Sequence, residues 1–406
     1  MVEVTSADYP EWLDQVFLGF GHEPPRDPQI LDYLMSARRH DHAVTVTKNN
    51  ACVATVGAFA FDMVMPGAQT IPVGAVASGT VVPAMRRQGL LAAMMVDLHN
   101  WCRETDLAAA VGVVAEWPLH ARRGYGPAAW HESLAIDVPG AGWRTDLDNG
   151  ATASYDLPRA KAPLFARRLF EAGARSTPGQ VIPTPSYWER FDLAEDDSLL
   201  DALLGLADEN AGVQRCAAAG EDGLVVYRES AGTGGQVLHV TDFLATTASS
   251  SATLWRHLLS LPDVKEIRVS RHPVDDPLRW WVVDARRLRP DRQDGLWLRP
   301  FDVPKLLNTR SWFGNGNLVL SVHDREGYAE GTFRLEVVAG RGSCSRSESH
   351  PDLEMDVSAL GAIMLGGVSA TSLTRSGRIA AHRMSSAQLW DSLAKSEREP
   401  FLAYGF

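Results

Sequence analysis

The sequence contains few cysteines, and those it has are far apart. Its 406 residues include four, at positions 52, 102, 216 and 344, with no Cys-x-x-Cys pair among them. This spacing excludes the dense disulfide framework of small secreted proteins and a cysteine-based zinc site. The twelve histidines also have no partners at metal-ligand spacing, so we expect no metal. The low cysteine content favours a reducing compartment, and we expect a cytoplasmic protein.

Positive charge is also in deficit. The chain has 39 lysines and arginines against 50 aspartates and glutamates, which gives a formal net charge of −11 at pH 7. This balance argues against nucleic acid as the main ligand, because nucleic-acid-binding domains are usually basic. Cationic small molecules would be attracted instead.

Long hydrophobic runs are missing. The apolar stretch over 107–115 has nine residues, whereas a membrane-spanning helix needs about 20. Glu3, Asp8 and Glu11 precede the first arginine or lysine, Arg26, so the basic start of a secretory signal is missing too. We therefore expect neither a secretory signal nor a membrane partner.

The composition is that of a folded protein. Hydrophobic residues make up 45% of the chain and charged residues 22%, a balance typical of soluble globular proteins. The chain is too long for one ordinary core, because single domains usually hold about 100 to 200 residues. We expect two or three domains.

The first 150 residues alternate strand and helix signals. β-rich runs predict strands at 43–47, 52–63, 71–82 and 107–115. Asn49-Asn50 predicts a tight hairpin turn between the first two, because asparagine tolerates positive φ. Apolar residues at helical spacing predict an amphipathic helix over 89–103. The last strand is nearly all apolar, as in sheets covered on both faces, so this part is an α/β domain.

Two further domains follow. Small polar residues at 149–151 and closely spaced prolines afterwards indicate a boundary near 150. A second α/β unit is predicted from a helix near 199–206, strands at 223–228, 236–244 and 266–270, and a helix at 251–261. We interpret 278–283, with Trp280 and Trp281, as a packed strand. Beyond 290, an α+β tail is predicted from a loop-helix piece at 304–308, strands at 317–322 and 331–338, a strand or helix entry at 352–356, and helices near 357–365 and 387–393.

The segment 80–91 carries the most specific signal. A strand ends, a basic turn containing Gly89 follows, and a helix begins. Unpaired backbone N–H groups and the helix dipole at such a turn bind pyrophosphate, and a glycine allows close approach. Arg86 and Arg87 would add charge. The alternative is an ordinary solvated helix entrance, for which an Arg-Arg-x-Gly sequence is also common.

These residues resemble a known family. Arg86-Arg87-Gln88-Gly89-Leu90-Leu91, between a strand and a helix, is similar to the motif that binds the acetyl-CoA pyrophosphate in GCN5-related N-acetyltransferases (GNAT). Leu91 stands where most of that superfamily has a small residue; the enhanced intracellular survival (Eis) family of aminoglycoside acetyltransferases is a branch with leucine there. Further resemblances to the Eis family lie at 120–128, which contains Gly-Tyr-Gly-Pro-Ala, at 356–361 and 365–368, and at the terminal Phe406.

The resemblance implies the fold class and the domain plan. It implies α/β and α+β architecture, with two tandem GNAT-like mixed-sheet domains followed by a sterol-carrier-like α+β domain. Residues 1–150 would form the acetyltransferase domain with the acetyl-CoA site, and 151–290 a degenerate copy without a cofactor motif. Residues 291–406 would form the third domain, which ends in the catalytic C-terminus. A homohexamer is also implied.

The resemblance further assigns roles to residues. It makes Tyr125 the general acid and the terminal carboxylate of Phe406 the general base. It places the coenzyme on Val81, Val82, Arg86, Arg87, Gln88, Gly89 and Leu90. Ala115 stands where the family has a serine. From the residues alone, Tyr125 could equally be a turn aromatic packed on the sheet, and Phe406 a frayed end, although the apolar segment 400–406 favours docking.

The expected activity is acetyl transfer from acetyl-CoA to primary amines. The acceptor would be an aminoglycoside or similar polycationic amine, or a lysine side chain, and transfer would be direct within a ternary complex. Asp27 and Glu116 are candidate acceptor-binding carboxylates, since ammonium groups need negative partners; Asp27 could equally be a helix cap. The alternative function is a lipid or sterol carrier that senses acyl-CoA without transferase activity.

Overall fold

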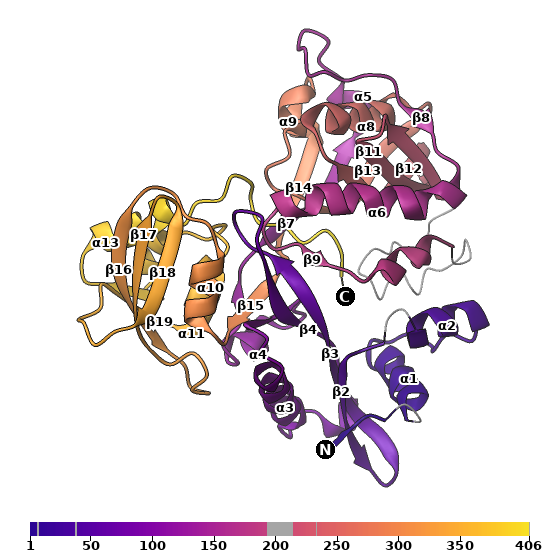
Figure 1. The fold of residues 1–406 in the computed structure, drawn as a ribbon. Coiled ribbons are helices and arrows are strands. Elements are labelled where there is room, and N and C mark those ends of the chain that lie inside the picture. Colours follow the sequence, from indigo (N-terminus) through magenta and orange to yellow (C-terminus); the bar gives the residue numbers. More distant parts are fainter. Residues whose placement is uncertain (6–7, 37–38, 193–213, 233, 406) are drawn as a thin grey trace.

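The computed structural model describes residues 1–405 except 6–7, 37–38, 193–213 and 233 (Figure 1). The described residues form three β-sheets with helices packed on them. The helix predicted near 199–206 and the terminal Phe406 lie outside the described residues.

The first sheet has the strand order β1-β2-β3-β4-β5-β15-β6, and β9 pairs with the end of β3. Its strands are β1 (Val2–Glu3), β2 (His42–Lys48), β3 (Ala51–Val64), β4 (Thr70–Val81), β5 (Ala109–Gly112), β6 (Gly126–Pro127), β9 (Val181–Ile182) and β15 (Trp297–Pro300). The predicted hairpin is confirmed: Asn49 and Asn50, with φ of 54° and 60°, join β2 to β3.

Helices cover both faces of this sheet (Figure 1). The predicted amphipathic helix is confirmed as α3 (Leu90–Glu104), which packs on Val44, whereas α1 (Tyr9–Gly19) packs in the cluster that contains Ala43. Neighbouring strand residues point to opposite faces, so the two helices lie on opposite sides of β2. The other helices of this part are α2 (Pro28–Ser36), α4 (Trp117–Ala121) and the 3₁₀ turn η1 (Pro83–Met85).

The second sheet has the order β14-β7-β13-β12-β11-β10-β8. Its strands are β7 (Trp130–Asp137), β8 (Tyr155–Asp156), β10 (Gln214–Ala219), β11 (Gly223–Gly232), β12 (Gly235–Ala245), β13 (Val264–His272) and β14 (Leu288–Asp294). Its helical segments are α5 (Val138–Ala141), η2 (Arg159–Lys161), α6 (Ala162–Gly173), η3 (Ala174–Ser176), η4 (Pro185–Asp192), α8 (Ala248–Ser260), α9 (Leu278–Trp281) and η5 (Ala285–Arg287). Helices α6 and α8 pack in different hydrophobic clusters on this sheet.

Two features differ from the sequence-based expectation. The sheets exchange strands: β7 precedes the expected boundary at 150 but pairs with β13 and β14, and β15 follows the boundary at 290 but pairs with β5 and β6. The prediction of a strand at 278–283 is wrong, because α9 occupies it and Trp280 is 70% exposed. Short apolar runs do not distinguish a strand from a helical turn.

The third sheet has the order β18-β17-β16-β19-β20. Its strands are β16 (Gly316–His323), β17 (Gly331–Val338), β18 (Arg341–Arg346), β19 (Leu353–Asp356) and β20 (Ile379–Ala381), and its helices are α10 (Val303–Thr309), α11 (Val357–Ile363), α12 (Ala370–Arg375) and α13 (Met384–Leu393). One hydrophobic cluster runs from β4 and β15 into this domain. The first and third domains therefore share a core.

Two glycines allow the closest contact between these domains. A Cβ on Gly126 would lie 1.9 Å from the Ser358 carbonyl oxygen, and one on Gly361 would lie 2.2 Å from the Leu298 carbonyl oxygen. Only glycine fits at such an approach. The Gly-Tyr-Gly segment and the α11 segment, which resemble the Eis family separately in sequence, thus pack directly against each other.

The C-terminal segment docks on the body of the protein. The Phe401 N–H donates to the Pro178 carbonyl at 2.9 Å, and the Ala403 N–H to Gln180 Oε1 at 3.1 Å. Tyr404 is buried and donates its hydroxyl to the Val181 carbonyl. The segment through Gly405 is therefore held against the strand β9. Within the described residues, no helix has the length and apolar character needed to cross a membrane.

Candidate active site

The turn between β4 and α3 is open at its backbone. Arg87 and Gly89 have φ of 61° and 79°, and residues 86–89 are exposed. A Cβ on Gly89 would meet nothing within 4 Å, and among the described residues no side chain caps the first turn of α3. Backbone N–H groups at the start of a 15-residue helix are thus accessible to an anion. Arg86 Nε donates to the Val81 carbonyl at 3.1 Å, which fixes the entry to the turn.

The edge of β4 beyond residue 76 is available for pairing. β4 and β5 are parallel neighbours from the pair Val73–Ala109 to the pair Val76–Gly112. Beyond Val76, β4 stays paired with β3 up to Val81, and no strand of the described residues pairs with its other edge. Val82 donates its N–H to Val53 on the β3 side, at 3.0 Å. Along a strand, the N–H groups of successive residues point alternately to its two sides. The Val81 N–H therefore points away from β3 and toward the open side. Of the two predicted strand contacts, the Val81 N–H faces the open side of β4, whereas the Val82 N–H is bonded to Val53.

Tyr125 lies at the other end of this open edge. It follows α4, its N–H donates to the His120 carbonyl at 3.2 Å, and its side chain is 1% exposed. The ring belongs to the cluster formed by the buried face of α3. Burial raises the pKa of the Tyr125 phenol well above its usual value. The hydroxyl lies 3.0 Å from His99 Nε2 on α3.

The distance between the open turn and Tyr125 can be followed along α3 and along β4. Leu91 of α3 lies at the level of Gly79, and Cys102 at the level of Gly74, so α3 runs antiparallel to β4. From Gly89 to His99 the helix rises about 15 Å, and from Val76 to Val81 the strand spans about 17 Å. Tyr125 therefore lies near the point where β4 and β5 separate, and the turn lies at the far end of the unpaired edge.

The two candidate acceptor carboxylates stand at helix starts, Asp27 before α2 and Glu116 before α4. Asp27 Oδ1 accepts the N–H groups of Gln29 and Ile30, at 2.8 and 3.4 Å, which is the helix-cap alternative. Glu116 is exposed at the start of α4, where its carbonyl oxygen lies 3.1 Å from His120 Nδ1. Ala115, next to it, is exposed.

The sequence-based reasoning missed a polar group beside the separation point. His40 Nε2 lies 3.0 Å from Ser78 Oγ, and His40 Nδ1 lies 2.8 Å from the Tyr9 hydroxyl. Ser78 has a φ of 58° and lies at a register shift between β3 and β4. The Ser78-Gly79 pair inside a strand was the available signal, since small residues there mark bulges.

The second domain repeats the strand arrangement without the open turn. β12 and β13 are parallel neighbours like β4 and β5, and α8 follows β12. Thr247 and Ser250 form a reciprocal capping box at the start of α8. Because those side chains take up the N–H groups of Thr247 and Ser250, this helix start offers fewer donors to a phosphate than the start of α3.

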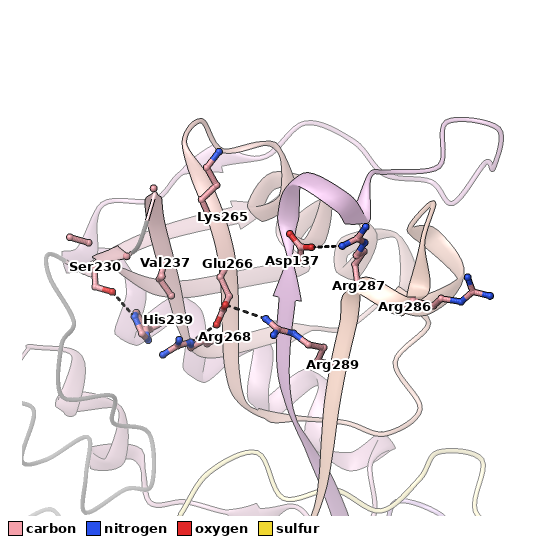
Figure 2. A pocket seen from close by; sticks show the side chains of 13 residues that line it. Asp137, Ser230, Val237, His239, Lys265, Glu266, Arg268, Arg286, Arg287 and Arg289 are labelled. Carbon is pink, nitrogen blue, oxygen red and sulfur yellow. Dashed lines mark hydrogen bonds and ion pairs between the residues drawn. The ribbon is translucent and has the colours of Figure 1, made fainter.

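A separate cavity of about 870 Å³ lies on the second sheet (Figure 2). Its lining includes Lys265, Arg268, Arg286, Arg287 and Arg289. Three of these arginines form ion pairs, Arg287 with Asp137 at 2.8 Å, and Arg268 and Arg289 with Glu266 at 2.6 and 3.2 Å. The cavity is built from β7, β11, β12, β13 and β14 and contains neither Tyr125 nor the open turn.

Comparison with known proteins agrees with this geometry. Residues 2–128 and 179–300 each match a family described as an acetyltransferase (GNAT) domain, and residues 303–403 match the sterol carrier protein domain. The N-acetyltransferase Eis of Mycobacterium tuberculosis is 30% identical over 325 residues, which are 78% of this chain and 76% of that protein. An uncharacterized N-acetyltransferase of Streptomyces avermitilis is 29% identical over 420 residues, 98% of this chain and 96% of that protein.

The fold is also similar to that of a solved structure. The crystal structure of Eis1 from Mycobacterium abscessus superimposes with a TM-score of 0.83 at 23% identity and covers 99% of this chain and 98% of that one. GNAT domains use acetyl-CoA, and the open turn, the free edge of β4 and Tyr125 fit such a coenzyme. The chain therefore belongs to the Eis family of GNAT enzymes, and it is an N-acetyltransferase.

Proposed function

We propose that the protein transfers acetyl groups directly to primary amines of a polycationic acceptor, such as an aminoglycoside, or to lysine side chains. The observation that carries this proposal is the single line from the open turn at Gly89, along the free edge of β4, to Tyr125. An extended coenzyme arm bound along β4 like an added strand would bring its reactive end to Tyr125. Positioning of this kind supplies much of the rate enhancement in group transfer.

The roles of the residues follow from the chemistry. Acetyl-CoA supplies the acetyl group as a thioester. Main-chain N–H groups near Val81 would stabilise the negative charge that develops on the carbonyl oxygen. Tyr125 would give its proton to the departing sulfur as the carbon–sulfur bond breaks, while the Phe406 carboxylate takes a proton from the attacking amine. A free carboxylate has a pKa of about 3.5, so its contribution is placement and charge more than basicity.

The acceptor class is proposed on charge. The net charge of −11 favours an acceptor with several ammonium groups. Exposed Asp27 and Glu116, together with the terminal carboxylate, would supply negative partners. Membership in an N-acetyltransferase family removes the support for a carrier without transferase activity.

Thiol release tests this function. Incubation with acetyl-CoA and kanamycin or tobramycin should release one free thiol for each acetyl unit found on the drug by mass spectrometry. The intact protein should carry no acetyl group, because transfer is direct. A lysine-containing peptide in a parallel reaction distinguishes the two acceptor types. Thiol release without an acetylated acceptor, or a covalent acetyl-enzyme that turns over, would contradict the proposal.

Gly89→Ala tests the coenzyme turn. An L-residue at the φ of 79° is strained by about 1 to 2 kcal/mol, so the turn should relax away from its binding shape. The KM for acetyl-CoA should then rise roughly tenfold with little change in kcat. Gly220→Ala is the matched control, because Gly220 also has positive φ and empty surroundings but lies in the second domain. Equal KM values in both variants would exclude the turn from coenzyme binding.

A further inference from the structure

Tyr125 is connected to the third domain by two consecutive hydrogen bonds. Its hydroxyl lies 3.0 Å from His99 Nε2, and His99 Nδ1 lies 2.8 Å from Glu326 Oε2. Glu326 belongs to the loop between β16 and β17 of the third domain. Its second oxygen accepts from Arg123, two residues before Tyr125, at 3.0 Å. The proposed acid and a carboxylate of another domain are thus two contacts apart.

The loop that carries Glu326 is firmly fixed. Arg299 of β15 donates through Nη2 to both carboxylate oxygens of Asp324, each at 2.9 Å. Both side chains are almost completely buried. The Asp324 carboxylate also accepts the N–H groups of Glu326 and Ala329, at 3.1 and 2.8 Å. Arg299 lies 3.6 Å from Glu326 as well. The buried charge-assisted bonds from Arg299 Nη2, together with these backbone bonds, hold the Glu326 backbone in one position.

The charges determine the direction of the hydrogen bonds. Burial alone would raise the pKa of Glu326, but the hydrogen bonds from His99 and Arg123 lower it to about 2, so Glu326 is ionised. Burial lowers the pKa of His99, which leaves the imidazole neutral at pH 7. Because Nδ1 faces a carboxylate, it carries the single ring proton. Nε2 is then an acceptor, and the Tyr125 hydroxyl donates to it.

We propose that His99 is a positioning residue for Tyr125 and that Glu326 of the third domain fixes the orientation and tautomer of His99. This inference rests on the role of Tyr125 in the proposed function. His99 holds the phenol oxygen at the point where β4 and β5 separate, and the departing sulfur must compete with Nε2 for the proton. The third domain thereby contributes to the chemistry of the first, in addition to the terminal carboxylate.

Three variants test the connection. His99→Phe keeps a ring but removes the acceptor, and kcat should fall roughly tenfold, as expected for loss of one buried hydrogen bond. The KM for acetyl-CoA should not change, because the open turn is untouched. His99→Gln can still accept from Tyr125 and should recover most of kcat. Glu326→Gln removes the charge that orients His99 and should lower kcat by a few-fold.

A double-mutant cycle separates positioning from general damage to the fold. In a Tyr125→Phe background, His99→Phe and Glu326→Gln should cause no further loss, because they act through the Tyr125 hydroxyl. His382→Gln is the control, since His382 pairs with Glu354 at 2.7 Å on the exposed side of the third domain and should leave kcat unchanged.

The outcomes distinguish the two proposals. If Tyr125→Phe itself retains full activity, the proposed function of Tyr125 fails. If Tyr125→Phe is impaired but His99→Phe matches the wild type, the positioning role alone is overturned. Equal losses from His99→Phe in both backgrounds would also overturn it. Should His99→Phe not fold, Glu326→Gln in the two backgrounds decides by the same criteria.

Discussion

Replacing Tyr125 with phenylalanine is expected to lower kcat by about 10²- to 10⁴-fold, with little change in the KM for acetyl-CoA. Phenylalanine fills the same buried position, so the packing of α3 is retained. Only the hydroxyl is lost, and with it the proton for the departing sulfur. The raised pKa of this phenol keeps the proton on Tyr125 at neutral pH, so the acid is fully loaded before the reaction.

The second domain contains a matched control for this variant. The Tyr227 hydroxyl lies 3.3 Å from His257 Nε2, and Tyr227 is 2% exposed. Tyr227→Phe removes a buried hydroxyl from a histidine partner in the same way, at a site without an open turn. Its kcat, followed by thiol release, should equal that of the wild type. A Tyr125→Phe enzyme as active as Tyr227→Phe would show that another group protonates the sulfur.

The parts of the site that were predictable from the sequence depend on short-range signals. Asn49-Asn50 marks its hairpin because each residue tolerates positive φ, and Gly89 marks the turn by the same property. The helix that follows Gly89 is predicted by the helical spacing of apolar residues over 89–103. Turns and helices of this kind depend on a few neighbouring residues, so local sequence patterns are enough to predict them.

The contacts that cross domains were not predictable in this way. His99 and Glu326 are 227 positions apart, and His99 has the spacing of an ordinary core residue on α3. The exchange of β7 and β15 between sheets also depends on which edges meet in three dimensions. One local signal was present: the glycines at 126 and 361 indicate close backbone approach, but their sequence does not identify what approaches.

The C-terminal segment is docked on the protein, so the role of the terminal carboxylate can be tested. Its N–H groups bond to residues 178 and 180, and the Tyr404 ring packs 4.6 Å from the Tyr187 ring, centroid to centroid. The described chain is therefore anchored up to Gly405, one residue before Phe406, which lies outside the described residues.

Adding a short Gly-Ser extension after Phe406 should lower kcat by at least about 10²-fold, while acetyl-CoA binding, measured by calorimetry, is retained. The extension turns the carboxylate into a neutral amide and moves the negative charge several ångströms away, so the attacking amine loses its proton acceptor. The same extension before Met1, which is 56% exposed, is the matched control and should leave turnover unchanged. Wild-type turnover by the C-terminally extended enzyme would remove the carboxylate from the mechanism. Because the coenzyme turn lies on β4 and α3, a loss of acetyl-CoA binding would instead indicate that the extension had displaced the docked segment.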